Sequence, residues 1–208
     1  NGVYLLASND DDTIENNLAE SSFSDMSLAG YGIDADVTDL VLPYADHLGL
    51  ERLRRLIASD GTPLRADDVL VTAGAASALF IVATSLIHAG DHLLVCAPNY
   101  VTNLETPRAI GAQLEPFELR FENCWRLDLD LLASRLRPET RLVSVTYPHN
   151  PTGATVPRAE LEELISVIEG HPTVRLLVDE TYRELAYGEP LPLAAALSPR
   201  VIGVSSMS

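Results

Sequence analysis

Residues 174–182 read Val-Arg-Leu-Leu-Val-Asp-Glu-Thr-Tyr, so that an apolar run ends abruptly in two carboxylates. The first acidic side chain arrives only at Asp179, a pattern typical of a strand that is buried on both faces of a parallel sheet. The carboxyl ends of such strands form the edge at which open α/β sheets bind ligands. The pattern therefore predicts that Asp179 stands at a ligand-binding edge.

A second run ends in the same way. Residues 142–147 read Leu-Val-Ser-Val-Thr-Tyr and lead into the turn-forming residues 148–153, Pro-His-Asn-Pro-Thr-Gly. An isolated Asp after a strand is more often a helix N-cap, and Asn150 before Pro-Thr-Gly makes a good turn in any protein. Two parallel strands, however, would deliver their polar ends to one edge of the sheet. The pair of runs therefore favours the ligand-binding interpretation.

From residue 50 onward, segments with helical spacing alternate with segments typical of strands. Helical patterns cover 50–57, 78–88, 100–111, 128–136 and 157–169, and strand patterns cover 67–72, 91–97, 113–119, 140–147, 174–178 and 201–204. This alternation indicates right-handed crossovers, so we expect an α/β fold with a mostly parallel sheet and helices on both faces. Short connections predict a single domain over residues 44–208, preceded by an arm over residues 1–43.

A turn of small residues, Thr-Ala-Gly-Ala-Ala-Ser at 72–77, joins the expected strand 67–72 to the helix 78–88. Unpaired backbone N–H groups at the start of a helix, at the positive end of its dipole, suit a phosphate. Close packing of the helix on the strand explains the same alanines equally well. The turn alone does not decide between the two interpretations.

Composition excludes several classes of partner. The 208 residues carry a formal net charge of −16, which would repel the phosphates of nucleic acids and of anionic membranes. Cys96 and Cys124 are too few for a disulfide framework and suit a reducing compartment. The apolar run around Cys96 predicts a buried, inert thiol. The aspartates at 10–12 lack the spacing of a calcium loop and predict a solvated acidic turn, so no metal site is expected.

The ends of the sequence lead to two further expectations. No stretch is apolar enough for a transmembrane helix, and the first residues lack the form of a signal peptide, so we expect a cytoplasmic protein. The sequence starts with Asn rather than Met and stops directly after the apolar run 201–204. A natural terminus at the end of a strand is unusual, and we therefore expect the chain to be part of a longer protein.

Six motifs in register resemble the class I/II aminotransferases, which are fold type I enzymes that use pyridoxal 5′-phosphate. The motifs are Tyr44 with Gly49-Leu50, Thr72-Ala73-Gly74-Ala75-Ala76, Pro98-Asn99-Tyr100, His149-Asn150-Pro151-Thr152-Gly153, Asp179-Glu180-Thr181-Tyr182 and Ser206-Met207-Ser208. They follow the family's order and are close to its spacing over residues 40–208. The resemblance implies a Schiff-base lysine immediately after Ser208 and a small C-terminal domain, both beyond this sequence.

The resemblance also implies a role for each residue around the cofactor ring. Asp179 matches the carboxylate that raises the pKa of the pyridinium nitrogen and so keeps it protonated. Asn150 and Tyr182 match the pair that hydrogen-bonds the 3′ oxygen of the ring, and Tyr100 matches the aromatic residue that stacks on its face. We therefore expect Asp179, Asn150 and Tyr182 to be the catalytic residues of this chain.

The phosphate of the cofactor has its own set of matching residues. The resemblance places it on the backbone N–H groups of Gly74, Ala75 and Ala76, with hydroxyl groups from Ser206 and Ser208. The family often has Asn, Ser, Thr or Gln near this glycine, whereas the alanines here offer fewer side-chain hydrogen bonds. We expect the backbone donors to carry more of the phosphate binding.

Tyr44 matches the tyrosine that reaches the phosphate of a neighbouring subunit, which implies a homodimer with shared active sites; a packing aromatic is the alternative. The implied activity acts on an amino acid as its external aldimine, most simply by amino-group transfer to a 2-oxo acid. Three alternative reactions use the same cofactor: elimination as in carbon–sulfur lyases, cyclisation and decarboxylation. A further alternative is a regulatory domain of the aminotransferase type that catalyses no reaction. The substrate stays open, because the family's carboxylate-binding arginine lies beyond residue 208.

Overall fold

The computed structural model describes residues 27–33, 41, 44–58 and 62–206. The chain divides into two compact units, Asn1–Leu42 with Ser208, and Pro43–Met207. The described part of the first unit contains the 3₁₀ helix η2 (Leu28–Tyr31), which Ser27 caps by accepting a hydrogen bond from Gly30 N at 3.2 Å. The acidic turn expected at residues 10–12 lies outside the described residues.

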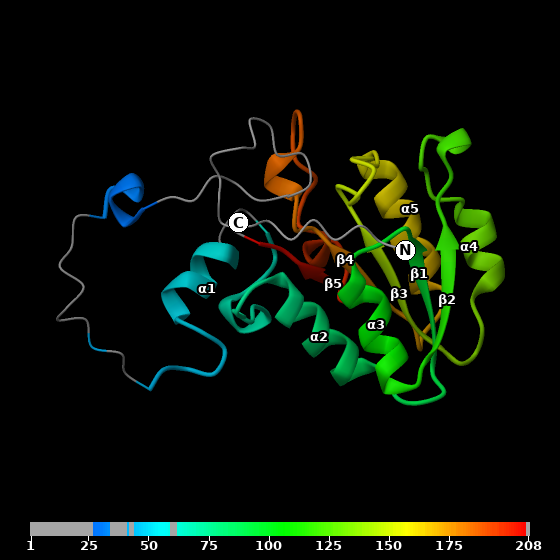
Figure 1. Ribbon diagram of the computed structural model, residues 1–208, viewed down its shortest axis with the longest axis horizontal. Helices are drawn as coiled ribbons and strands as arrows, with labels where there is room; N and C mark the ends of the chain where they lie inside the picture. The colour runs from blue at the N-terminus through cyan, green and yellow to red at the C-terminus, as the bar shows by residue number, and fades with distance from the viewer. Residues whose placement is uncertain (1–26, 34–40, 42–43, 59–61, 207–208) are drawn as a thin grey trace, which may run out of the picture. The chain divides into compact units, whose positions relative to one another are not determined.

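A sheet of five parallel strands runs through the second unit in the order β2-β1-β3-β4-β5 (Figure 1). The strands are β1 (His92–Ala97), β2 (Gln113–Glu118), β3 (Thr140–Thr146), β4 (Arg175–Asp179) and β5 (Val201–Val204). The central strands β3 and β4 are buried along almost their whole length, as their continuous apolar runs predict. The expected parallel α/β architecture is confirmed.

Helices cover both faces of this sheet (Figure 1). The helices α4 (Leu129–Arg135) and α5 (Arg158–Glu169) pack on one face, and α2 (Ala75–Leu86) and α3 (Val101–Ile110) pack on the other. Alternate residues of each strand point to opposite faces, so Leu94 and Val145 join the first core while Leu93 and Val95 join the second. The core therefore consists of two apolar layers separated by the sheet.

Shorter helices lie in the connections and before the sheet. The helix α1 (Glu51–Ala58) comes first, and the 3₁₀ helices are η3 (Ala66–Asp68), η4 (Phe121–Asn123), η5 (Arg183–Leu185) and η6 (Ala194–Ala196). Among the described residues, none of the helices is long and apolar enough to cross a membrane. Cys96 is buried in β1, as expected, and burial raises the pKa of its thiol to about 12.

The strand order creates a switch point between β1 and β3. After β1 the chain adds β2 on one side, and it then crosses to add β3, β4 and β5 on the other side. At such a point two neighbouring connections leave the sheet in opposite directions, which opens a crevice at the carboxyl ends of the strands. The ends of β1, β3 and β4 border this crevice, and they carry the predicted motifs.

Two boundaries differ from the sequence prediction. Residues 69–72 do not form the expected strand, because Val71 N donates to Leu48 O at 2.9 Å in the segment before α1 rather than to a neighbouring strand. The helix α2 begins at Ala75, three residues before the predicted start at 78. The small residues 75–77 read as a turn, but they form the first turn of the helix.

The buried face of α1 also differs from a simple apolar stripe. Leu50, just before the helix, and Leu56 within it are 65% and 60% exposed, whereas Arg54 is 3% exposed. The Arg54 guanidinium donates to Gly49 O at 3.1 Å, to Ala66 O at 2.7 Å and to Asp46 Oδ2 at 2.8 Å. These three acceptors satisfy the buried cation and make it the residue that ties α1 to its surroundings.

Candidate active site

Asp179 ends β4, and its register partner on β3 is Thr146. Only 4% of the residue is exposed. Its Oδ1 accepts hydrogen bonds from Thr181 N at 3.2 Å and Thr181 Oγ1 at 2.6 Å, and its Oδ2 accepts one from Asn103 Nδ2 at 3.4 Å. A carboxylate accepts about four hydrogen bonds, so this buried group retains capacity for a donor from a ligand.

Two asparagines hold this carboxylate from the side of β1 and α3. Asn103 Nδ2 also donates to Asn99 Oδ1 at 3.0 Å, and the same oxygen accepts from Thr146 Oγ1 at 3.2 Å. Asn99 Nδ2 in turn donates to Cys96 O at 3.0 Å. The amides therefore link the carboxyl ends of β1, β3 and β4. Sequence motifs do not reveal Asn103, because its contact with Asp179 depends on how α3 packs.

Asn150 and Tyr182 come together as predicted. Asn150 Nδ2 donates to Tyr182 OH at 3.4 Å, and both residues are half-buried. The loop that carries Asn150 is fixed by His149, which is 2% exposed and has its Nδ1 at 2.8 Å from Thr152 Oγ1 and its Nε2 at 2.9 Å from Pro98 O. Burial lowers the pKa of His149. A neutral ring therefore donates from Nε2 to the carbonyl and accepts the Thr152 hydroxyl at Nδ1.

The turn before α2 has the geometry of an anion-binding helix start. Gly74 has a φ of 83°, a backbone conformation that suits glycine. No side chain caps α2, and its first turn contains no acidic residue. The first N–H groups of a helix have no partner within it, so those of Ala75 and Ala76 are available at the positive end of the dipole. Thr72 Oγ1 braces the turn by donating to Gly74 O at 2.9 Å.

The other predicted residues lie in three different settings. Tyr100 is 45% exposed at the start of α3, directly after Asn99, and Ser206 is half-buried just beyond β5. Tyr44 is 93% exposed, with its ring edge-on to His47 at 5.8 Å between centroids, so it does not pack into the core of the second unit. Ser208 lies outside the described residues.

Glu180 follows Asp179 directly, and the sequence analysis assigned it no role although it belongs to the motif at 179–182. It is 3% exposed, its Oε1 accepts from Ala194 N at 3.0 Å, and its Oε2 is 3.9 Å from Arg183 Nε. Burial raises the pKa of Glu180 to about 7, against the opposing effects of the Ala194 N–H and of Arg183. A Cβ on Gly203 would approach Glu180 Oε1 to 2.5 Å, so a larger residue at this position on β5 would displace the Glu180 carboxyl group.

Comparison with known proteins identifies the family. Residues 33–208 match the family model described as aminotransferase class I and II. The chain belongs to this family. The predicted resemblance and the fold type I architecture are thus confirmed, and the buried Asp179 edge lies inside the matched region.

Individual aminotransferase relatives agree with this assignment. The chain is 35% identical over 173 residues to an arginine–pyruvate transaminase from Pseudomonas aeruginosa. This alignment covers 79% of the chain and 44% of the transaminase. It is 38% identical over 147 residues to a capreomycidine synthase from Streptomyces vinaceus, and this alignment covers 71% of the chain and 37% of the synthase. The crystal structure of a PLP-dependent aminotransferase from Streptococcus suis superposes with a TM-score of 0.75 at 30% identity, over 80% of this chain and 44% of that one. This aminotransferase-family chain therefore spans less than half the length of these relatives.

Proposed function

We propose that the protein containing this chain transfers the amino group of an amino acid to a 2-oxo acid, with pyridoxal 5′-phosphate as its cofactor. The observation that carries the proposal is the Asp179 carboxylate, which is 4% exposed at the switch point and still has acceptor capacity. A family of aminotransferases provides the reaction class. The substrate side chain stays open, because the relatives' names differ in it.

We infer that residues of this chain would hold the cofactor at its ring nitrogen, its 3′ oxygen and its phosphate. When bound, pyridoxal 5′-phosphate supplies an electron sink for breaking a bond at the substrate Cα. Asp179 would accept the N–H of the pyridine ring and hold its proton, since a buried carboxylate favours the charged form of a cation beside it. Thr181 and Asn103 orient the carboxylate by donating to it at 2.6 Å and 3.4 Å. The proposed catalytic role of Asp179 is thus to hold a proton on the nitrogen of the pyridine ring.

Asn150 and Tyr182 supply the donors for the other side of the ring. Their mutual hydrogen bond of 3.4 Å places the amide and the phenol together, and both groups can donate to the 3′ oxygen and stabilise its anionic form. Tyr100 at the start of α3 would cover one face of the ring, because its exposed side chain follows Asn99, which belongs to the network around Asp179. These residues position the ring rather than transfer protons.

The phosphate would bind at the turn before α2. The N–H groups of Ala75 and Ala76 and the hydroxyl of Ser206 would provide donors, and we infer the same for Ser208. Gly74, the third backbone donor expected from the sequence, instead donates its N–H to Thr72 O at 2.9 Å. Tyr44 of a neighbouring subunit would add its hydroxyl, so the proposal includes a homodimer with shared sites. The proposed domain division keeps residues 1–43 as an arm and residues 44–208 as part of the large cofactor domain. The Schiff-base lysine is proposed to follow Ser208.

The full-length protein tests this function directly. We expect it to be yellow, to be fixed to its cofactor by borohydride, and to convert an amino acid and pyruvate or 2-oxoglutarate into the matching 2-oxo acid and new amino acid. Mass spectrometry with ¹⁵N-labelled donor amino acids measures the transfer. A colourless protein after reconstitution would contradict the cofactor, and release of ¹⁵N ammonia without a labelled amino acid would indicate elimination instead of transfer.

A further inference from the structure

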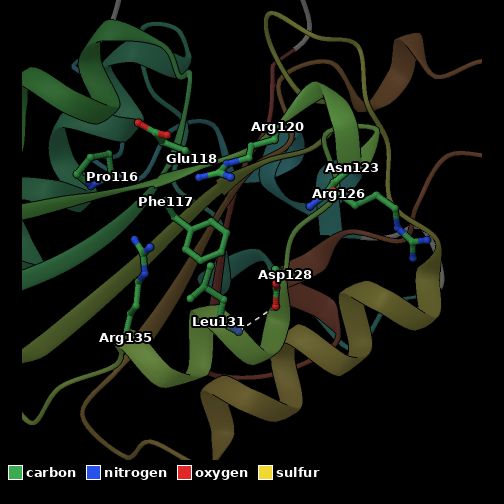
Figure 2. Close-up of a pocket in the computed structure, with 9 residues that line it drawn as sticks. All are labelled: Pro116, Phe117, Glu118, Arg120, Asn123, Arg126, Asp128, Leu131 and Arg135. Atoms are coloured by element: carbon green, nitrogen blue, oxygen red, sulfur yellow. Dashed lines mark hydrogen bonds between the residues drawn. The ribbon is translucent and has the colours of Figure 1, made fainter.

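A cavity of about 380 Å³ opens at the carboxyl end of β2, between that strand, the loop that follows it and α4 (Figure 2). Small-molecule sites have volumes of about 300–1,000 Å³, so the cavity has room for a compact ligand. The strands β1 and β3 lie between β2 and β4 in the sheet. The cavity is therefore separate from the Asp179 edge.

Three arginines line this cavity in a chain of net charge −16. Arg126 is held by Glu160 Oε2, to which its Nε donates at 3.2 Å. Arg135 lies with its Cζ 5.4 Å from the centre of the Phe117 ring and its Nη1 at 3.5 Å from Glu115 Oε1. Arg120 makes no side-chain hydrogen bond or ion pair with any residue that the structure describes. Two cations thus have acidic partners, and the guanidinium of Arg120 has none in the part of the chain that the structure describes.

Two acidic residues, Glu118 and Asp128, line the cavity together with the arginines. Asp128 caps α4, because its Oδ1 accepts from Leu131 N at 2.9 Å. Figure 2 shows Glu118 pointing away from Phe117, to the other side of β2, as neighbouring residues of a strand do. The lining therefore presents three guanidinium groups, the carboxylates of Glu118 and Asp128 and the exposed apolar side chain of Leu131, whereas Phe117 is only 3% exposed.

The loop that supplies Arg120 and Arg126 contains two residues in an energetically unfavourable backbone conformation. Cys124 and Trp125 are consecutive non-glycine residues with φ of 52° and 59°. Such conformations persist where the surroundings determine them, and they are common at ligand clamps. Trp125 packs against the core on the α4 and α5 side, and Arg120 O accepts hydrogen bonds from Asn123 N at 3.1 Å and Trp125 N at 2.9 Å. The loop is thus held in the shape that presents its arginines.

We propose that this cavity is a second binding site, for a small organic anion in which a carboxylate is attached to a compact apolar group. Arg120 and Arg135 would pair with the carboxylate, because the planar guanidinium fork matches its two oxygens. The apolar group would pack on Leu131, which is 42% exposed. Bare phosphate offers the charge without the apolar group and is expected to bind more weakly.

The full-length, cofactor-loaded protein tests this site by ¹⁹F NMR titration with 4-fluorophenylacetate, in the presence of a saturating amino-acid substrate. We expect saturable binding that Arg120→Gln weakens about tenfold, the effect of losing a charge-assisted hydrogen bond. Asp128→Asn should tighten binding severalfold, because asparagine keeps the helix cap and removes the opposing charge. Arg52→Gln is the matched control: this exposed α1 arginine does not line the cavity, so its loss should leave the affinity unchanged.

Several outcomes would overturn the proposal. The first is that wild type and a folded Arg120→Gln variant bind 4-fluorophenylacetate with equal affinity, and the second is that the neutral 4-fluorophenylacetamide binds as tightly as the acid. The third is displacement of 4-fluorophenylacetate by inorganic phosphate at equal concentration, and the fourth is loss of all its binding when substrate is present. Thermal midpoints establish that each variant is folded. If Arg120→Gln does not fold, the Asp128→Asn arm decides, since an unchanged or weaker affinity there contradicts an anion site.

Discussion

At the scale of single residues, the candidate site depends on how firmly Asp179 is oriented. Its two oxygens are held from different directions, Oδ1 by Thr181 within the same loop and Oδ2 by Asn103 from α3. A carboxylate held on both sides keeps a fixed direction for its remaining lone pairs, which is what a bound cation requires. The orientation, and not only the charge, is therefore a property that substitution can test.

Asn103→Ala tests the α3 side of this arrangement. The substitution removes the donor to Asp179 Oδ2 and to Asn99 Oδ1, and we expect about 1–3 kcal/mol lower stability and about tenfold slower turnover with the cofactor still bound. Chemical denaturation and steady-state kinetics on the full-length enzyme measure both effects. Thr106→Ala on the same helix is the control, and turnover equal to that control would show that Asn103 does not orient Asp179.

Glu180 leads to a pH-dependent prediction. Burial raises its folded-state pKa to about 7, above the ordinary glutamate value of 4.5. The folded state therefore binds a proton more tightly than the unfolded state and loses stability as pH rises between these values. Glu180→Gln keeps an oxygen for Ala194 N and removes the buried charge. We expect the variant to gain on the order of 2 kcal/mol over wild type at pH 8 and clearly less at pH 5. An equal difference at both pH values would contradict a buried, titrating carboxylate.

At the scale of elements, the sequence predicts strand ends better than it predicts which face a helix buries. The runs ending at Thr146 and Asp179 are recognisable because a strand buried on both faces must be apolar throughout, and the structure places their ends side by side. In α1 the apolar Leu56 is 60% exposed, whereas Arg54 is buried. The acceptors that satisfy Arg54 come from Gly49, Ala66 and Asp46. Such acceptors depend on tertiary packing, which local spacing does not encode. The contact between Asn103 and Asp179 could not be predicted from the sequence for the same reason.

The turn before α2 provides a prediction at this scale. Ala75→Pro removes one N–H from the first helical position, where proline is tolerated and where Gly74 before it has an extended ψ of 164°. We expect about tenfold weaker cofactor binding from losing one donor to the phosphate, with the stability of the cofactor-free protein unchanged. Ala75→Ser keeps the N–H and serves as control. Cofactor titration by absorbance measures the affinity. Equal affinity of the two variants would contradict phosphate binding at the Ala75 N–H.

At the scale of the whole molecule, the proposed assembly rests on Tyr44. Its residue is 93% exposed and its ring contacts His47 among the described residues, which suits a side chain that serves a neighbouring subunit. Symmetric homodimers have two equivalent copies of such a contact. A heterodimer made from two different defective subunits then contains one site with both defects and one site with none.

Mixing Tyr44→Phe subunits with Asp179→Ala subunits tests this sharing. If Tyr44 serves the partner's phosphate and Asp179 serves its own site, the heterodimer should recover up to about half of the wild-type activity per dimer. Differently tagged subunits allow the heterodimer to be isolated before the assay. Absence of recovery in isolated heterodimers would place both residues in the site of one subunit.

The most direct test of the central claim is Cα–H cleavage in the Asp179→Asn variant. Asparagine keeps the volume and the capping capacity of Asp179 but removes the charge that holds the ring proton. In a folded, cofactor-loaded full-length protein, we predict that single-turnover exchange of Cα deuterium slows by several orders of magnitude while the thermal midpoint stays close to that of wild type. Exchange at a rate near that of wild type would contradict the account, because Asp179 would then be a structural cap and not the group that holds the ring proton.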